Sequence, residues 1–569
     1  MSSIQNEITK KLTTARELIN NNNFLKAENI YKEIIQKAPN DFEANLNLGT
    51  IYAKQMKFKD AVYFLEVAAK QNLNVSVIYN NLGLIYSHLG QNDKALEVLN
   101  KVISLNSATT ITYSHLGIAY TNLSRIFEAK QSYKKSLDLD PKNILSLYNY
   151  GSLFKRLGDF KNSEKYLLNA ILVSPKYFPS YNNLMELYDK SNQNQKLKNL
   201  LEDAKKIFKS NISLDLFEAK YLFKLKEYKK VIQILEKIKF EGKEKYKEHN
   251  RTEFLAKSFD HLSKFKFAFK YFEETNKINY DLNKNNVDKN KYISAIDQRY
   301  QFFKSQKNII WNEKKDNRNE QEPVFLIGFP RSGTTLLDTI LRSHPLIDVL
   351  EEKPIVDRFT DKLHEKINFD FYKLENKDLD KEMEDFYIKE RKKYISKKIC
   401  KVIIDKMPLN TVYVAEILRF FPNSKFIFAI RHPADCVLSC FMQNFKLNNA
   451  MSNFLNLSDA AILYDKVMNL WTLYNEKLNI NSHMIRYEDV VLNFEEQIKK
   501  ILHFLDLNWS NEVTEFYKTA KNRGILNTPS YNQVSQPLYS KSIGRWKNYQ
   551  DEFQDINPIL DKWIQKFGY

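Results

Sequence analysis

The chain has 569 residues, more than one hydrophobic core usually supports, so we expect two or more domains. Hydrophobic residues make up 43% of it, yet no apolar run approaches the roughly 20 residues that a membrane-spanning helix needs, which argues against a membrane span. The formal charge of +18 comes without an aromatic-basic nucleic-acid module, so we expect no nucleic-acid partner.

The first residues of the chain and its cysteines indicate the cellular compartment that we expect for the protein. The opening residues 1–5 are polar and lack the apolar core of a signal peptide. The three cysteines, Cys400, Cys436 and Cys440, are odd in number and have no metal-ligand spacing with histidine. We therefore expect a cytoplasmic protein without a disulfide framework and without a metal site.

The first half of the chain repeats itself with a period of 34 residues. Glycines followed three residues later by an aromatic residue stand at Gly49, Gly83, Gly117 and Gly151. Small residues recur in phase at Ala27, Ala61, Ala95, Ala129 and Ser163. This is the tetratricopeptide (TPR) pattern, in which small residues let two antiparallel helices approach and the aromatic residue fills the groove.

The repeats predict an all-α superhelical TPR solenoid over residues 1–280, clear over about 10–180 and degenerate to about 280. Stacked repeats leave a concave surface that usually binds peptides, so we expect a protein or peptide partner there. Residues 281–321 are rich in Asn, Lys, Asp and Gln and are predicted to join the solenoid to a second domain, 322–569.

The second domain opens with a phosphate loop. The apolar run 324–327 predicts a buried strand, and the spacing of apolar residues after Thr335 predicts a helix. Between them, Gly328 and Gly333 permit close backbone approach, and the amides that open the helix point at any bound anion. Thr334 stands where a nucleoside-triphosphate loop needs its lysine, which disfavours a kinase or ATPase.

Three later apolar segments predict further buried strands, each with polar residues at its end. These residues are Glu351 and Glu352 after one segment, Lys406 after the next and Arg431 after the third. Strands that alternate with helices indicate a central parallel sheet, whose ligands lie at the carboxyl ends of the strands. Adjacent residues on an extended segment point to opposite faces, so only one of the two glutamates should reach a substrate.

The segment 330–335, Pro-Arg-Ser-Gly-Thr-Thr, resembles the 5′-phosphosulfate loop of sulfotransferases that use 3′-phosphoadenosine 5′-phosphosulfate (PAPS). Arg431 and Ser439, eight residues apart, have the spacing of that family's 3′-phosphate site. With the glutamate pair, the likeness is closest to tyrosylprotein sulfotransferases and to bacterial TPR-sulfotransferase fusions. The resemblance implies a P-loop-like α/β sulfotransferase domain that uses PAPS as co-substrate and no metal.

The resemblance also implies roles for individual residues. Glu352 falls on the catalytic base, and Arg331, Lys406 and Ser530 would assist the sulfuryl group. Donor binding falls on Arg331, Ser332, Gly333, Thr334, Thr335, Arg431, Ser439, Tyr487, Ser530 and Arg545, the last in place of the family's lysine.

The acceptor stays open at this point, with protein tyrosine and sugar hydroxyls as candidates. Pro354 stands where the tyrosine-modifying enzymes carry an arginine that takes part in acceptor recognition. The solenoid would recruit or present a protein or glycan acceptor. The alternative is a TPR scaffold protein whose nucleotide-binding domain is catalytically inactive.

Overall fold

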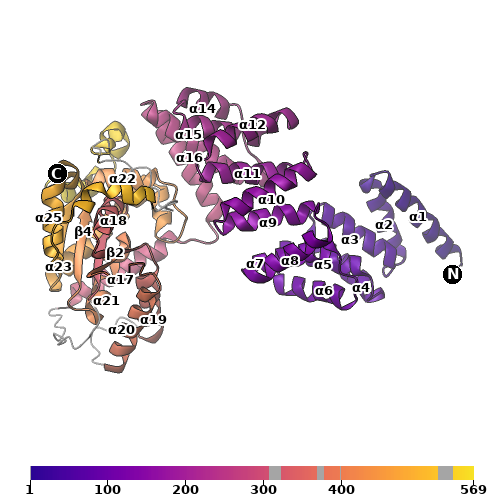
Figure 1. Cartoon of the computed structure of the whole chain (residues 1–569), viewed down its shortest axis with the longest axis horizontal. Helices are drawn as coiled ribbons and strands as arrows, with labels where there is room; N and C mark the ends of the chain where they lie inside the picture. The colour runs from indigo at the N-terminus through magenta and orange to yellow at the C-terminus, as the bar shows by residue number, and fades with distance from the viewer. Residues whose placement is uncertain (1, 307–321, 368–376, 398, 523–537, 539–541) are drawn as a thin grey trace. The chain divides into compact units, whose positions relative to one another are not determined.

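The computed structural model describes residues 2–306, 322–367, 377–397, 399–522, 538 and 542–569. The chain divides into two compact units, Met1–Tyr221 and Leu222–Tyr569, here called the N-terminal and C-terminal units (Figure 1). No helix within the described ranges is both long enough and apolar enough to cross a bilayer.

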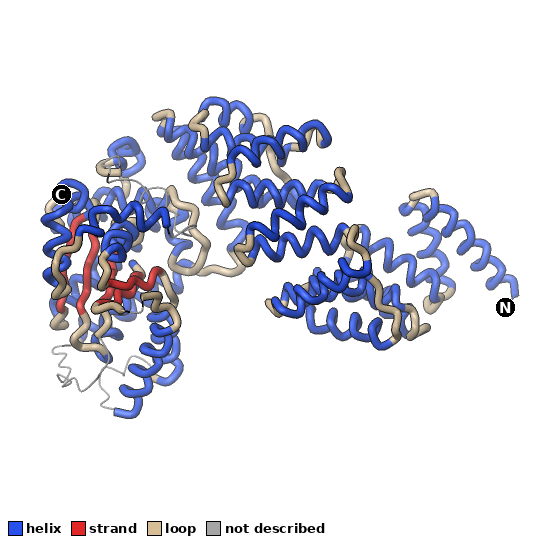
Figure 2. The backbone as a smooth tube through the Cα atoms, viewed as in Figure 1, coloured by secondary structure: helices blue, strands red, loops and turns tan. Residues whose placement is uncertain are grey.

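The N-terminal unit is built from helices joined by short turns (Figure 2). They are α1 (Ser2–Asn20), α2 (Phe24–Lys37), α3 (Phe42–Lys54), α4 (Phe58–Gln71), α5 (Ser76–His88), α6 (Asn92–Ser104), α7 (Thr110–Asn122), α8 (Ile126–Leu139), α9 (Ile144–Arg156), α10 (Phe160–Val173), α11 (Phe178–Lys190), α12 (Asn194–Ile207) and most of α13 (Ile212–Lys224). Consecutive helices from α1 to α12 pack on one another along the chain, which confirms the predicted all-α solenoid.

The repeated small residues explain how closely these helices pack. The phased residues Ala27, Ala61, Ala95, Ala129 and Ser163 are all fully buried. A Cβ atom added at any of the four repeat glycines would lie 2.4 to 2.8 Å from a side chain of the following helix. Those side chains are Leu65, Leu99, Tyr133 and Leu167. The repeat is therefore a packing rule in which each glycine leaves room for the next helix.

The C-terminal unit begins with helices that precede its sheet: α14 (Tyr228–Leu235), α15 (Lys245–His261), α16 (Phe265–Asn283) and α17 (Lys289–Ser305). The Asn276 side chain donates to the Phe441 carbonyl oxygen (3.0 Å), and the rings of Phe269 and Phe441 stack. A buried ion pair joins Arg299 to Glu416 (2.7 Å). These contacts place α16 and α17 against the sheet-containing part. The domain boundaries near 280 and 322 remain predictions.

The sheet has five strands, all parallel to their neighbours: β1 (Val324–Gly328), β2 (Ile347–Glu351), β3 (Val402–Lys406), β4 (Lys425–Ile430) and β5 (Asn481–Arg486). Their order is β2-β3-β1-β4-β5, so β1 lies in the middle with the chain winding to both sides of it. In such sheets a crevice forms at the carboxyl ends of the strands where the winding reverses. The predicted α/β fold with a central parallel sheet is confirmed.

Helices that follow the strands carry or support the site. They include α18 (Thr334–Ser343), α19 (Ile355–Lys366), α20 (Lys377–Lys392), α21 (Val414–Phe420), α22 (Pro433–Phe441), α23 (Leu457–Lys477), α24 (Tyr487–Leu492), α25 (Phe494–Phe504), α26 (Phe516–Asn522) and α28 (Asn557–Lys566). Three short 3₁₀ helices also matter below: η3 (Pro408–Tyr413), η4 (Met451–Leu455) and η6 (Arg545–Phe553). The side chains of Phe325, Leu326 and Ile327 in β1 are fully buried, so the central strand is held rigidly.

Candidate active site

The phosphate loop runs from the end of β1 to the start of α18, and its two glycines have no substitute. Gly328 has φ +153°, and an added Cβ would lie 2.3 Å from the Ala429 carbonyl oxygen on β4. Gly333 has φ +96°, and its Cβ would lie 2.7 Å from the Tyr487 ring. Positive φ and close neighbours both exclude a side chain at these glycines, so they preserve the turn that leads into the backbone amides at the start of α18.

A threonine missed by sequence reasoning fastens the start of this loop. The Thr411 hydroxyl accepts a hydrogen bond from the Gly328 amide (3.0 Å) and donates to the Gly328 carbonyl oxygen (2.9 Å). Thr411 lies in η3, directly after β3, and no sequence pattern marks it. Inside the loop, Ser332 and Thr334 are buried. Among the described residues, the Ser332 hydroxyl has no hydrogen-bond partner.

Arg431 follows β4, the strand that pairs with β1, and it contacts the phosphate loop. The Arg331 Nε donates to the Ser439 hydroxyl on α22 (2.9 Å), and Arg431 donates to the Arg331 carbonyl oxygen (3.4 Å). The guanidinium of Arg431 also lies 5.1 Å from the centre of the Tyr487 ring. The structure therefore brings together four residues that sequence reasoning assigned to donor binding.

A small cavity of about 30 Å³ opens among these groups. Its lining consists of Arg331, Arg431, Asp435, Leu438, Ser439, Ser542 and Arg545. The Nε of Arg431 is buried and has no hydrogen-bond partner among the described residues. Buried donors normally have partners, so this guanidinium suits an anionic ligand.

Asp435 organises this cavity, although sequence reasoning assigned it no role. Its carboxylate is buried and lies 3.6 Å from the Arg431 guanidinium, one helical turn along the chain. It also accepts hydrogen bonds from the backbone amides of Gly544 (2.7 Å) and Trp546 (2.9 Å). The available signal was the four-residue spacing from Arg431 at a helix N-terminus.

Lys406 is the last residue of β3 and lies close to three carboxylates. Its side chain is fully buried, and its Nζ lies 2.7 Å from Glu352, 3.5 Å from Glu351 and 3.9 Å from Asp338. The expectation that the two glutamates point to opposite faces is wrong. Glu352 has φ +48° and leaves the extended conformation, so both carboxylates reach the same amine.

Exposure separates the two glutamates. The Glu352 side chain is 43% exposed and that of Glu351 is 12% exposed.

Asp405, which precedes Lys406 in β3, faces the other side of the sheet, where the Tyr387 hydroxyl donates to it (3.2 Å). Burial raises the pKa of Asp405 to about 7. Asp405 is therefore not part of the Lys406 cluster. Ser530 lies outside the described residues.

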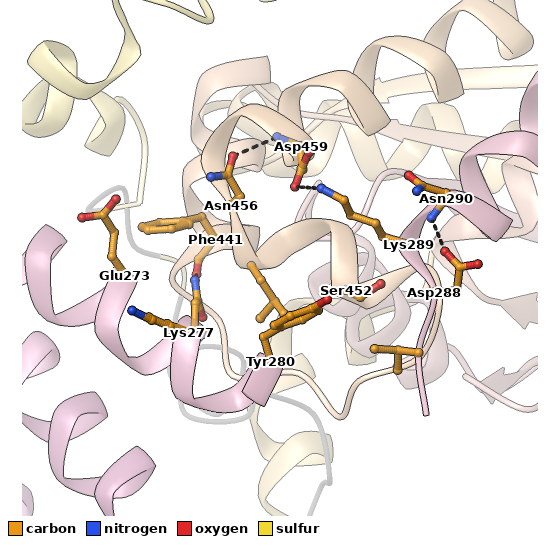
Figure 3. A pocket seen from close by; sticks show the side chains of 13 residues that line it. Glu273, Lys277, Tyr280, Asp288, Lys289, Asn290, Phe441, Ser452, Asn456 and Asp459 are labelled. Atoms are coloured by element: carbon orange, nitrogen blue, oxygen red, sulfur yellow. Dashed lines mark hydrogen bonds and ion pairs between the residues drawn. The ribbon is translucent and has the colours of Figure 1, made fainter. Parts of the chain in front are cut away.

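A second cavity, of about 480 Å³, lies between α16, the start of α17 and the helices after β4 (Figure 3). Phe441 and Tyr280 line it, and Lys289 donates to Asp459 at its side (2.6 Å). None of the described residues that the sequence assigned to the active site is among its lining residues.

Comparison with known proteins identifies both parts of the chain. Residues 323–511 match the model of the sulfotransferase family. Tetratricopeptide-repeat models match residues 12–74, 77–109, 112–143 and 145–177. The chain thus carries TPR repeats followed by a sulfotransferase-family domain, as the resemblance implied.

The relatives match this chain over less than half of its length. An uncharacterized protein of Aquifex aeolicus is 26% identical over 268 residues, which cover 45% of this chain and 35% of that protein. Protein-tyrosine sulfotransferase 2 of Gallus gallus is 25% identical over 266 residues, covering 44% of this chain and 70% of its own. A solved tetratricopeptide repeat protein from Parabacteroides merdae has a TM-score of 0.36 at 20% identity, covering 44% of this chain and 98% of its own.

Proposed function

We propose that the C-terminal unit is a sulfotransferase that transfers a sulfuryl group from PAPS to an acceptor hydroxyl. The observation that carries this proposal is the pairing of two anion sites at the carboxyl ends of β1 and β4. One is the phosphate loop, and the other is the cavity that Arg331, Arg431 and Ser439 line. A donor with a 5′-phosphosulfate and a 3′-phosphate needs both sites.

The donor's groups fit polar atoms that have no hydrogen-bond partner in the part of the chain that the structure describes. A buried polar atom left unpaired costs roughly 1–3 kcal/mol, so a ligand oxygen that pairs with it binds favourably. The Ser332 hydroxyl and the Nε of Arg431 are two such atoms among the described residues. In this proposal the loop 330–335 holds the phosphosulfate, and Arg431 with Ser439 holds the 3′-phosphate. Tyr487 and Arg545 complete the donor site.

Glu352 is the proposed base. An acceptor hydroxyl is largely protonated at neutral pH, so a carboxylate must take its proton as the acceptor oxygen bonds to sulfur. The bond between sulfur and the phosphate oxygen breaks in the same step, and its electrons leave with adenosine 3′,5′-bisphosphate. Lys406 holds one oxygen of Glu352 (2.7 Å), while the side chain stays accessible to an acceptor.

Cations around the transferred group supply the remaining stabilisation. Arg331 and Lys406 would offset charge on the sulfuryl oxygens and on the departing nucleotide, and Ser530 would add a hydroxyl donor. Fixed donors of this kind in a site that excludes water are typically worth about 3–4 kcal/mol each. This scheme requires no metal.

For the acceptor we favour a protein tyrosine that the repeats recruit. Support comes from the relatives named protein-tyrosine sulfotransferase and from the TPR repeats, which typically bind proteins. Because Pro354 stands where the tyrosine-modifying enzymes carry an arginine, a glycan hydroxyl is the second candidate acceptor.

Binding and turnover test the proposal together. The full chain should bind adenosine 3′,5′-bisphosphate more tightly than adenosine 5′-phosphate or ATP in calorimetry. Mass spectrometry should then detect sulfate on tyrosine peptides or glycans incubated with PAPS and the protein. Equal binding of ATP would contradict the donor assignment. Bisphosphate binding without turnover on any acceptor would favour the alternative, a scaffold with an inactive nucleotide domain.

A further inference from the structure

Arg545, the first residue of η6, is held by a residue of α15, a helix that precedes the sheet in the chain. Its Nη2 donates to one carboxylate oxygen of Asp260 on α15 (2.7 Å). The Tyr549 hydroxyl donates to the other oxygen of the same carboxylate (2.6 Å). The rings of Phe265 and Tyr549 pack edge to face beside this contact, with centroids 5.2 Å apart. Both carboxylate oxygens of Asp260 therefore accept hydrogen bonds from side chains of η6.

The sheet side holds the same segment by its backbone. Asp435 accepts from the amides of Gly544 and Trp546, which flank Arg545 in the chain. Arg431 donates to the Ser542 carbonyl oxygen just before them. Asp435 thus fixes the main chain around Arg545, while Asp260 sets the direction of its side chain.

The charges explain why a second carboxylate is needed. Three guanidinium groups, those of Arg331, Arg431 and Arg545, line one small cavity and repel one another. Asp435 lies beside Arg431, and Asp260 pairs with Arg545. Arg545 is 36% exposed, so without Asp260 its long side chain can turn toward solvent and away from its neighbours.

We infer that Asp260 is a positioning residue of the donor site, which keeps Arg545 in the cavity where the donor's 3′-phosphate binds. This inference rests on the proposed function. Asp260 lies on α15, before the residues 323–511 that match the sulfotransferase family. A helix outside the matched region therefore completes the site that selects a 3′-phosphorylated nucleotide.

Full-chain variants test this inference by calorimetry with adenosine 3′,5′-bisphosphate and adenosine 5′-phosphate. Asp260→Asn should weaken the bisphosphate about 3- to 10-fold, which corresponds to the loss of about one ordinary hydrogen bond, and leave the monophosphate unchanged. Asp260→Glu should recover most of that loss. Arg545→Ala should show a similar loss, and combining it with Asp260→Asn should add little, because both changes remove one interaction.

A matched control comes from the same helix. Glu253 on α15 accepts a hydrogen bond from Asn444 (3.1 Å) and does not line the cavity, so Glu253→Gln should leave the ratio of the two affinities unchanged. Tyr549→Phe is a milder variant, which frees one oxygen of Asp260 and keeps the ion pair. It should lower the ratio of bisphosphate affinity to monophosphate affinity about 2-fold. This variant therefore tests the inference even if Asp260→Asn does not fold.

Two results would overturn the inference. One is an unchanged affinity ratio in both Asp260→Asn and Tyr549→Phe. The other is tighter bisphosphate binding by Asp260→Asn, which would make Asp260 a competitor of the phosphate for Arg545. Failure of the proposed function looks different, because then the wild-type chain would not distinguish the bisphosphate from the monophosphate.

Discussion

The two units bury different kinds of side chain. Among the described residues of Met1–Tyr221, Glu28 and His115 are the buried acidic or basic side chains, and burial lowers the pKa of His115 to about 4, so that it is neutral near pH 7. The C-terminal unit buries many, including Asp338, Lys406 and Arg431 at the candidate active site. Burying a charge is costly unless it is paired, so such groups persist where an arrangement of partners or a function requires them.

The difference separates a packing module from a chemical one. In the N-terminal unit the same small and apolar positions recur, and each repeat is stabilised by its neighbours. In the C-terminal unit, pairs such as Lys406 with Glu352 join residues from separate strands or loops. Substitutions of buried residues should therefore alter packing in the N-terminal unit, whereas in the C-terminal unit they should also alter chemistry.

The largest expected effect is on turnover. Glu352→Gln keeps the shape of the side chain but cannot accept a proton, so kcat should fall by about two to four decades, the usual contribution of a general base. Donor affinity in calorimetry should be nearly unchanged. Glu351→Gln is the matched control, because Glu351 contacts the same lysine but is largely shielded from solvent. Near-normal turnover in Glu352→Gln would assign the base role elsewhere, with Glu351 tested first.

The next effect is on the pH dependence of stability. Burial raises the pKa of Asp405 from 3.8 to about 7. Between these values the folded chain keeps a proton that the unfolded chain releases, so stability falls as pH rises from about 4 to 7. Asp405→Asn stays neutral and should stabilise the C-terminal unit at pH 8 by on the order of 4 kcal/mol, and by less at pH 5.

Asp348 provides the opposite case for the same experiment. Burial opposes ionisation of Asp348, but hydrogen bonds from the Ser396 and Lys397 amides outweigh it, so its pKa lies below the usual value. Asp348→Asn should therefore destabilise at neutral pH, with a loss that shrinks in acid. All five tryptophans lie after residue 221, so urea unfolding followed by tryptophan fluorescence reports on the C-terminal unit alone. Identical responses of the two variants to pH would contradict these assignments.

Much of the fold could be predicted because its signals are local. The repeat spacing reveals the solenoid, since each glycine and small residue serves the contact with an adjacent helix. Apolar runs such as 324–327 reveal buried strands, and the residues at their ends, including Arg431, lie at the carboxyl edge of the sheet. These positions follow from the apolar runs and from the parallel arrangement of the strands.

The missed features depend on contacts between distant residues. Asp260 and Arg545 are 285 positions apart, and nothing near either one indicates the other. The turn of Glu352 into positive φ brings both glutamates onto Lys406, which the alternation of an extended strand cannot predict. Thr411 acts through the backbone of Gly328, a contact with no side-chain signature.

A smaller effect is expected in donor selection. Arg431→Ala removes a charge-assisted contact worth roughly 1.5–3 kcal/mol, so affinity for adenosine 3′,5′-bisphosphate should fall about 10- to 100-fold. Adenosine 5′-phosphate, which lacks the 3′-phosphate, should bind almost as before. Arg358→Ala removes a half-exposed arginine that pairs with Glu390 and should change neither affinity. Equal losses for both nucleotides would remove Arg431 from the 3′-phosphate site.

The smallest effect concerns the solenoid and tests whether the two units are stabilised independently. A Cβ at Gly117 would lie 2.4 Å from the ring of Tyr133, whereas at Gly151 it would meet the Leu167 side chain at 2.8 Å. Overpacking costs typically about 1–3 kcal/mol, and a rigid ring yields less than a leucine, so Gly117→Ala should destabilise more than Gly151→Ala. Helix propensity offsets about 1 kcal/mol in both variants equally. Far-ultraviolet circular dichroism should show earlier loss of helix in urea, while the tryptophan transition and bisphosphate affinity stay unchanged. An equal shift of the tryptophan transition would mean that the units unfold together, and the contrast in buried charge would then describe two parts of one cooperative structure.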